Sequence, residues 1–248
     1  MKQDAMLDKP QKEPILRAPP IVLVLCAVLI GVHFILFSLE PDISFGLVMM
    51  FGFVPALLGE SFVSFLTLIS YAFLHGSWEH VLMNSVWLLV FGTPVAIRLG
   101  GVWRFFTFYV VCALIAGLTH YVIYAQTLVP LIGASGAVSG MFGAATRFAI
   151  PGVSWLSPDQ ARRQLPLMPL RQTLTRRPVY SFIAVWIGLN IVFGVSAYSL
   201  SGDPISVAWQ AHIGGFLAGL VLLPFFERPP ISPSGGPGYV EYGRWAGS

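Results

Sequence analysis

The stretch IVLVLCAVLIGVHFILFSL occupies residues 21–39 and contains no charged side chain. A helix needs about 20 mainly apolar residues to cross the hydrocarbon core of a bilayer, so this stretch predicts a membrane span. The composition agrees, because 56% of all residues are hydrophobic and 10% are charged, whereas a typical soluble domain has roughly 25% charged residues. A soluble fold could not bury so much apolar surface, and the sequence therefore predicts a polytopic membrane protein.

Five further apolar runs follow, at residues 80–97, 103–125, 131–150, 179–200 and 205–226. We therefore expect an all-α bundle of six transmembrane helices. Another apolar region, residues 43–74, is interrupted at Gly59 and Glu60 into two pieces that are each shorter than a comfortable span. Pieces of that length are more often interfacial or re-entrant segments. We expect this first loop to be embedded in the outer leaflet, and two additional spans are the alternative.

The positions of the basic residues test this order of spans. All fourteen lie in four places: before the first run, at the turn between the second and third, from the end of the fourth to the start of the fifth, or after the sixth. They are Lys2, Lys9, Lys12, Arg17, Arg98, Arg104, Arg147, Arg162, Arg163, Arg171, Arg176, Arg177, Arg228 and Arg244. The loops on the other side of the membrane contain no Lys or Arg. Their charged residues are all acidic: Glu40, Asp42, Glu60, Glu79 and Asp203. With a cytoplasmic N-terminus, this distribution follows the positive-inside rule. Two extra spans within residues 43–74 would preserve the pattern, whereas one would invert it.

The remaining segments flank the membrane domain, which we assign to residues 21–226. Residues 1–20 combine mixed charge with several prolines, so we expect a cytoplasmic segment and no cleaved signal peptide. Residues 227–248 are rich in Pro and Gly and are expected to form a disordered cytoplasmic tail. The short loops are typical of a bacterial inner-membrane protein.

Ser135 is the first candidate for chemistry, in the sequence Gly133-Ala134-Ser135-Gly136 that opens the fourth run. Small residues of this kind also serve close helix packing in membranes, which is the alternative interpretation. A helix N-terminus, however, offers free N–H groups and the positive end of the helix dipole. Such donors can stabilise an oxyanion that forms beside a serine nucleophile.

His212 lies in the sixth run and is the candidate general base, with a buried, hydrogen-bonded histidine as the alternative. Gly215 and Gly219 follow it in a G-x-x-x-G pattern that lets another helix approach closely. The fourth run offers matching small residues: Gly136, Gly140 and Gly143. Both runs begin at the outer face, so we expect His212 and Ser135 to meet at matched depth, within hydrogen-bond reach.

His80 and Asn84 open the second run and lie four residues apart, on one helix face. They are candidate oxyanion donors, and helix capping or a helix–helix hydrogen bond is the alternative. No run contains Asp or Glu, which favours a Ser–His dyad over a triad unless Glu79 or Asp203 bends inward. His75 is expected to hold the first loop against the second helix.

These motifs, in this order, resemble the rhomboid family of intramembrane serine proteases. The matching pieces are His75-Gly-Ser-Trp-Glu-His80-Val-Leu-Met-Asn84, Gly133-Ala-Ser135-Gly136 and Ala211-His212-Ile-Gly-Gly215-Phe-Leu-Ala-Gly219, and they cover the chain from about residue 70 to 225. The resemblance implies a six-helix core with a cavity open to water on the outer side. It implies that Ser135 is the nucleophile, that His212 is the general base, and that His80, Asn84 and the Ser135 N–H form the oxyanion hole.

The resemblance also implies partners. Substrates of the family are typically single-span membrane proteins whose helix unwinds easily, and a mobile fifth span or the loop at residues 43–78 would gate their access. No cofactor, metal ion or nucleic acid is expected.

The sequence departs from the family pattern at three places. Leu66-Thr67 replaces a Trp-Arg pair in the loop, Ser139 replaces an aromatic residue that stacks on the histidine, and Ala96 replaces a Glu near Arg98.

Two other hypotheses stay open at this point. One is a non-catalytic protein that binds membrane segments. The other is a transporter, or a metal site built from His75, His80 and His212, although the HExxH spacing of a zinc protease is absent.

Overall fold

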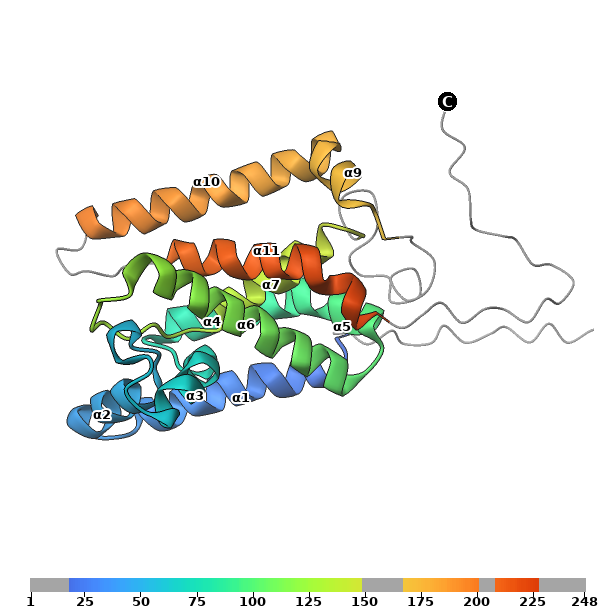
Figure 1. Ribbon diagram of the computed structural model, residues 1–248. Helices are drawn as coiled ribbons and strands as arrows, with labels where there is room; N and C mark the ends of the chain where they lie inside the picture. Colours follow the sequence, from blue (N-terminus) through green and yellow to red (C-terminus); the bar gives the residue numbers. More distant parts are fainter. Residues whose placement is uncertain (1–17, 149–166, 201–207, 228–248) are drawn as a thin grey trace, which may run out of the picture.

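A computed structural model of the chain describes residues 18–148, 167–200 and 208–227, with the backbone alone over 193–200. These residues form an all-helical protein, shown in Figure 1. Outside the helices, an isolated antiparallel bridge joins Phe53 to Leu131. The predicted N-terminal segment and C-terminal tail lie outside the described residues, apart from their first or last few positions.

Four of the described helical stretches are long and apolar enough to cross a membrane: Pro20–Phe37, Trp78–Leu99, Val102–Tyr124 and Trp209–Phe226. They correspond to the predicted first, second, third and sixth runs. Helix α1 (Pro20–Phe37) begins with Pro20 at its first position, where the missing N–H of proline costs nothing. Helices α6 (Val102–Tyr124) and α11 (Trp209–Phe226) complete the set with the interrupted second span.

The second span has an irregular middle. It consists of α4 (Trp78–Trp87), a π-helical turn (Leu88–Gly92) and α5 (Thr93–Leu99). Pro94 has no N–H to donate to the preceding turn, and a local π adjustment is one way for a helix in a membrane to accommodate a proline. The span ends at Gly100, whose φ of 61° is the left-handed conformation of a helix C-terminus.

The fourth run differs from the prediction in length, whereas the fifth agrees with it. Helix α7 (Ser135–Ala145) has 11 residues, which at ~1.5 Å per residue reach only about half of the hydrocarbon thickness. It is shorter than residues 131–150 because Gly133 takes a φ of 121° and keeps the preceding backbone out of the helix. Helix α10 (Arg177–Leu200) follows the short α9 (Leu170–Thr175) and has 24 residues, so it coincides with the predicted fifth run at residues 179–200. Because α7 is short, a count of six spans stays a prediction.

The first loop folds into two short helices, α2 (Pro41–Phe51) and α3 (Phe62–Ser70), with 3-10 turns at Pro55–Leu57 and Tyr71–Phe73. Neither helix has the length of a span. The loop is tied to the segment before α7, because the backbones of Phe53 and Leu131 exchange hydrogen bonds and Ala56 N–H donates to Thr127 O at 3.1 Å. Its insertion into a leaflet stays a prediction.

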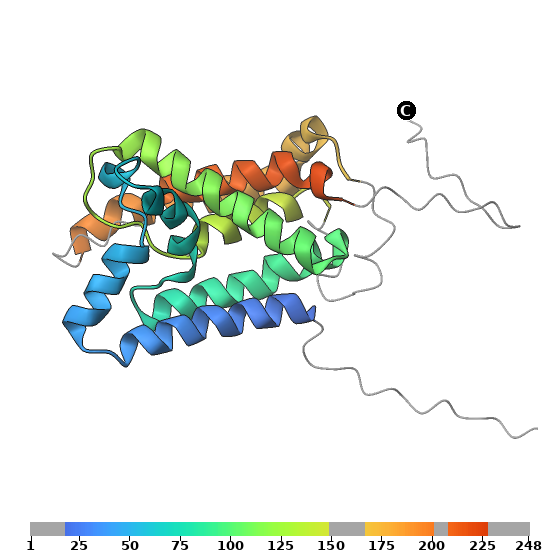
Figure 2. The same ribbon diagram turned by 60° about the horizontal axis from the view of Figure 1, so that its bottom comes forward.

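Helix α7 lies at the centre of the bundle. All of its residues from Gly136 to Ala145 are buried, and it packs most extensively against α11 and then α6. Figure 2 shows α1 beside the second span on one side, whereas Figure 1 shows α10 alone along the opposite edge, next to α11. The predicted site residues Ser135 and His212 therefore belong to the central pair of helices.

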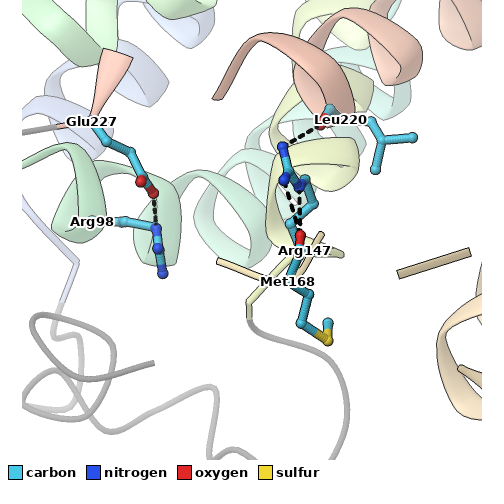
Figure 3. A network of polar contacts seen from close by, with 5 residues as sticks. All are labelled: Arg98, Arg147, Met168, Leu220 and Glu227. Carbon is cyan, nitrogen blue, oxygen red and sulfur yellow. Dashed lines mark hydrogen bonds and ion pairs between the residues drawn. The ribbon is translucent and has the colours of Figure 1, made fainter. Parts of the chain in front are cut away.

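Two arginine side chains make polar contacts beyond the C-terminal end of α7, as Figure 3 shows. Arg147 is buried and donates through Nε and Nη2 to Met168 O, at 3.1 and 2.9 Å, and through Nη1 to Leu220 O at 3.2 Å. It thereby joins the end of α7 to α11 and to the chain that leads into α9. Beside it, Arg98 forms an ion pair with Glu227 and lies over the ring of Phe148.

Candidate active site

Ser135 and His212 meet at the N-terminal ends of α7 and α11. Ser135 is the first residue of α7, and His212 lies in the first turn of α11. The distance between Ser135 Oγ and His212 Nε2 is 2.7 Å, which is a normal hydrogen bond. The structure thus brings together the two side chains that the sequence placed at matched depth.

Backbone contact between the two helices makes this meeting possible. We call the five glycines that face one another here, Gly136, Gly140, Gly143, Gly215 and Gly219, the α7–α11 seam. A Cβ added at Gly215 would collide with the carbonyl of Gly136, one at Gly219 with the carbonyl of Gly140, and one at Gly143 with the carbonyl of Phe216. The predicted role of these glycines in close packing is confirmed, and only the absence of a side chain permits the spacing.

His80 borders the turn that leads into Ser135. A Cβ built on Gly133 would lie 2.7 Å from His80 Nε2 and 3.6 Å from Ser135 Oγ, so the imidazole and the hydroxyl flank the same point. Gly133 is required there for two reasons. Its φ of 121° suits only glycine, and any side chain would displace the His80 ring.

Asn84 lies one turn further along α4 and is buried. Its Nδ2 donates to the carbonyl oxygen of His80 at 3.0 Å. Among the described hydrogen bonds, none joins Asn84 to Ser135. The structure therefore places His80 beside the serine. Asn84 contacts the backbone of His80 instead, and one of its two amide hydrogens is taken up by that hydrogen bond.

His75 supports the same turn from the loop side. Its Nε2 accepts a hydrogen bond from the N–H of Ala134 at 3.4 Å, and its carbonyl oxygen accepts one from His33 Nδ1 at 3.0 Å. Burial lowers the pKa of His75 to about 3, and its neighbours His80 and His33 contribute to the shift. A neutral His75 keeps the lone pair that the Ala134 amide needs. The residue connects α1 to the start of α7 rather than only holding the loop.

A further polar residue lies at the site that the sequence analysis did not single out. His212 Nδ1 is 2.6 Å from Asn190 Oδ1, and Asn190 Nδ2 donates to the carbonyl oxygen of Trp186 at 2.8 Å. Asn190 is an uncharged polar residue inside the apolar fifth run. The rule that polar groups in a membrane suggest function, which singled out Asn84, applied to it equally.

Ser135, His212 and His80 are each half-buried, so part of each side chain is exposed at the surface. The proposed metal site of His75, His80 and His212 can be compared with the positions of these three side chains. The rings of His75 and His80 lie 4.9 Å apart, but His212 pairs with Ser135 and Asn190 instead. Among the described residues, no three His, Cys, Asp or Glu side chains gather into a possible metal-binding group.

Comparison with known proteins places the chain in a family. The family model described as "Rhomboid domain" matches residues 63–228, which include Ser135, His212, His80 and Asn84. The chain belongs to the rhomboid family. It is also similar to the rhomboid protease GlpG of Serratia proteamaculans (strain 568), with 30% identity over 154 residues. That alignment covers 62% of this chain and 45% of the relative, so the chain spans less than half of the length of that protein.

At the places where this chain departs from the rhomboid pattern, the structure shows other contacts. Arg98, which lacks a Glu at position 96, pairs with Glu227 from the end of α11. The loop that lacks the Trp-Arg pair is held by the Phe53–Leu131 bridge and by Ser70 Oγ, which donates to Phe51 O at 2.6 Å.

Ser139, where many relatives carry an aromatic residue, is buried in α7. A serine offers His212 no ring to stack on, and the imidazole has Asn190 as its second partner instead.

Proposed function

We propose that this rhomboid protein is a serine endopeptidase that cleaves transmembrane segments of other membrane proteins through a Ser135–His212 dyad. The observation that carries the proposal is the 2.7 Å separation between Ser135 Oγ and His212 Nε2 at the N-terminus of α7. A serine is activated as a nucleophile by a base within such reach. The half-buried position of both side chains leaves the pair accessible to a substrate backbone and to water.

The acylation step follows from these atoms. Ser135 Oγ bonds to the carbonyl carbon of the scissile peptide while its proton passes to His212 Nε2. The developing oxyanion is placed beside the free N–H groups at the start of α7 and beside His80, with Asn84 as a further donor. Collapse of the intermediate breaks the C–N bond, and the proton on His212 moves to the leaving amine. An ester to Ser135 remains.

Deacylation uses the same groups in reverse. A water molecule gives a proton to His212 Nε2 as its oxygen bonds to the ester carbon. The ester C–O bond then breaks, and the proton returns to Ser135 Oγ. The new C-terminus leaves, and the enzyme is restored to its starting state.

We further propose the membrane placement in which this chemistry operates. The membrane domain is residues 21–226, with six spans, both termini in the cytoplasm of a bacterial cell and the loop of residues 43–74 in the outer leaflet. The positive-inside distribution of Lys and Arg supports this topology. It places Ser135 in the outer half of the bilayer. The resemblance to the rhomboid family implies single-span proteins with an easily unwound helix as the substrates.

Cleavage of a single-span reporter tests the proposal. Wild type, Ser135→Ala, His212→Ala and Ser139→Ala are reconstituted in liposomes, and reporter fragments and labelling by a fluorophosphonate are followed. Wild type and Ser139→Ala are expected to cleave and to be labelled at Ser135. Ser139→Ala is the matched control, because it removes a hydroxyl from the next turn of α7.

Ser135→Ala and His212→Ala are both expected to lose cleavage and labelling. Equal cleavage by wild type and Ser135→Ala would refute the proposal. A wild type that binds the reporter without cleaving it would indicate the non-catalytic, segment-binding alternative.

A further inference from the structure

The hydrogen bonds of Asn190 determine which nitrogen of His212 carries the proton. The carbonyl oxygen of Trp186 can only accept, so the amide atom 2.8 Å from it is the NH2 nitrogen of Asn190. The other amide atom, which faces His212 Nδ1 at 2.6 Å, is therefore the oxygen. Because that oxygen can only accept, Nδ1 must donate and carry the hydrogen. In a neutral imidazole, Nε2 is then left with the lone pair.

That lone pair points at the serine, since His212 Nε2 is 2.7 Å from Ser135 Oγ. We propose that Asn190 is a positioning residue for the reaction: it holds His212 in the one tautomer and ring orientation that can take the proton of Ser135. This inference rests on the proposed protease function. It assigns to a residue of α10 a task that an acidic residue performs in a Ser–His–Asp triad, without placing a charge in the membrane.

The position of Asn190 on α10 gives the contact a second consequence. Over its described side chains, α10 buries only Val179 and Ile183. Its other ties to the central helices include Trp186, whose ring stacks on Phe216 at 5.1 Å, and Phe182, whose ring meets Phe142 edge-on at 5.4 Å. Side-chain contacts of this kind can separate without breaking either helix. His212 therefore has its orienting partner only while α10 is docked against α11.

Docking of α10 and competence of the base are thus coupled through one hydrogen bond. If α10 moves aside, His212 loses its Nδ1 acceptor and the imidazole can turn or change tautomer. The site would then be least reactive when it is most open, and would regain its base when α10 closes on a bound segment.

A purely structural role is the competing explanation. Hydrogen bonds between polar side chains commonly hold membrane helices together. Loss of such a bond would alter stability and apparent substrate affinity. Loss of the positioning bond should alter the turnover number instead, even for a small probe that needs no movement of α10.

The test compares Asn190→Leu, which removes the acceptor at similar size, with Asn190→Asp, which keeps an oxygen facing His212. Leu189→Ala is the matched control, because Leu189 is the neighbouring residue on α10 and is 49% exposed. Asn190→Leu is expected to lower kcat and the rate of fluorophosphonate labelling by about tenfold, the size of one well-formed hydrogen bond. Its KM is expected to stay at the wild-type value. Asn190→Asp should recover most of the labelling rate, and Leu189→Ala should match wild type.

A second measurement reads the tautomer without any activity. In protein labelled with ¹⁵N-histidine, the His212 ring signals are identified by their absence from His212→Ala. Wild type is expected to show a single tautomer with hydrogen on Nδ1. Asn190→Leu is expected to show a mixture or the other tautomer.

The outcomes separate the two proposals. A wild type that neither cleaves nor labels at Ser135 would refute the protease function, and the ¹⁵N spectrum would still decide whether Asn190 orients His212. Wild-type kcat, labelling rate and tautomer in Asn190→Leu would refute the positioning role while leaving the protease function intact. A change in KM alone, without rescue by Asn190→Asp, would indicate the structural role and also overturn the inference.

Discussion

The two helices that carry the partners of His212 are held in different ways. Helix α7 meets α11 through the α7–α11 seam, where a Cβ at Gly143, Gly215 or Gly219 would collide with the backbone of the facing helix. Helix α10 meets the same central helices through side chains, and a Cβ at its Gly188 would have nothing within 4 Å. Ser135 lies on the first of these helices, and Asn190 lies on the second.

The difference shows how one site combines rigidity with access. Nucleophile and base must keep their separation to within a fraction of an ångström to react, and a seam without side chains leaves no room for them to shift. A substrate helix needs a surface that can yield, and α10 offers mainly exposed apolar residues. Asn190 is the residue through which α10 contacts His212 of the closely packed helices α7 and α11.

The largest expected effect lies on the rigid side, at His80. His80→Ala removes the imidazole beside Gly133 and Ser135, and loss of one oxyanion donor typically lowers kcat by about 10²–10³-fold. We expect a drop of that size, measured as reporter turnover in liposomes, which exceeds the drop expected for any substitution on α10. His120→Ala, which removes the same side chain from α6 where its ring lies 5.2 Å from that of Tyr124, should keep kcat. A kcat for His80→Ala within twofold of wild type would remove His80 from the oxyanion site.

The next effect compares one added methyl group at two places. Gly219→Ala forces a Cβ against the backbone of Gly140 and should cost about 3 kcal/mol of unfolding free energy, near the upper end for overpacking. Gly188→Ala on α10 enters open space and should be neutral or stabilising by about 0.5–1 kcal/mol, since alanine loses less entropy in a helix. Unfolding free energies measured in bicelles test the pair. Equal effects at the two positions would contradict the contrast between the helices.

A smaller effect is expected where Arg147 anchors the chain that leads into α9. Arg147→Met removes the donors that hold Met168 O and Leu220 O, and should lower the unfolding free energy by about 2 kcal/mol because both carbonyls lose a charged donor. Arg171→Met, on the exposed surface of α9, is the matched control and should change little. Protease cleavage within residues 167–176 should become faster in Arg147→Met alone. Unchanged stability would show that Arg147 is not a clamp.

The smallest effect is a pH dependence at the turn before α7. The unfolded chain protonates His75 near its ordinary pKa of 6.5, whereas the folded protein resists protonation down to about 3. Below pH 6.5 the unfolded state binds more protons, so the unfolding free energy falls as the pH falls, by about 1 kcal/mol at about pH 5.5 for one such group. His75→Gln keeps an acceptor for the Ala134 amide but cannot be protonated, and its slope should be shallower. Identical slopes in both proteins would show that His75 does not contribute.

Sequence reasoning was most successful where a feature depends on spacing along one helix. The four apolar runs that match long helices were located to within a few residues, because hydrophobic length is a local property. The pairing of glycines across the α7–α11 seam followed from their one-turn spacing. The fourth run was predicted too long, because the turn at Gly133 lies within a stretch that is apolar throughout.

The sequence by itself determined the class of protein, most of the spans, and the choice of Ser135 and His212, because length, charge and helical period need no knowledge of neighbours. Only the tertiary structure decided the partners that lie far apart in the chain. Asn190 meets His212 across 22 residues, and Glu227 meets Arg98 across 129. These pairs depend on which helices pack side by side and on how each is rotated, and neither property is encoded in the spacing of a single segment.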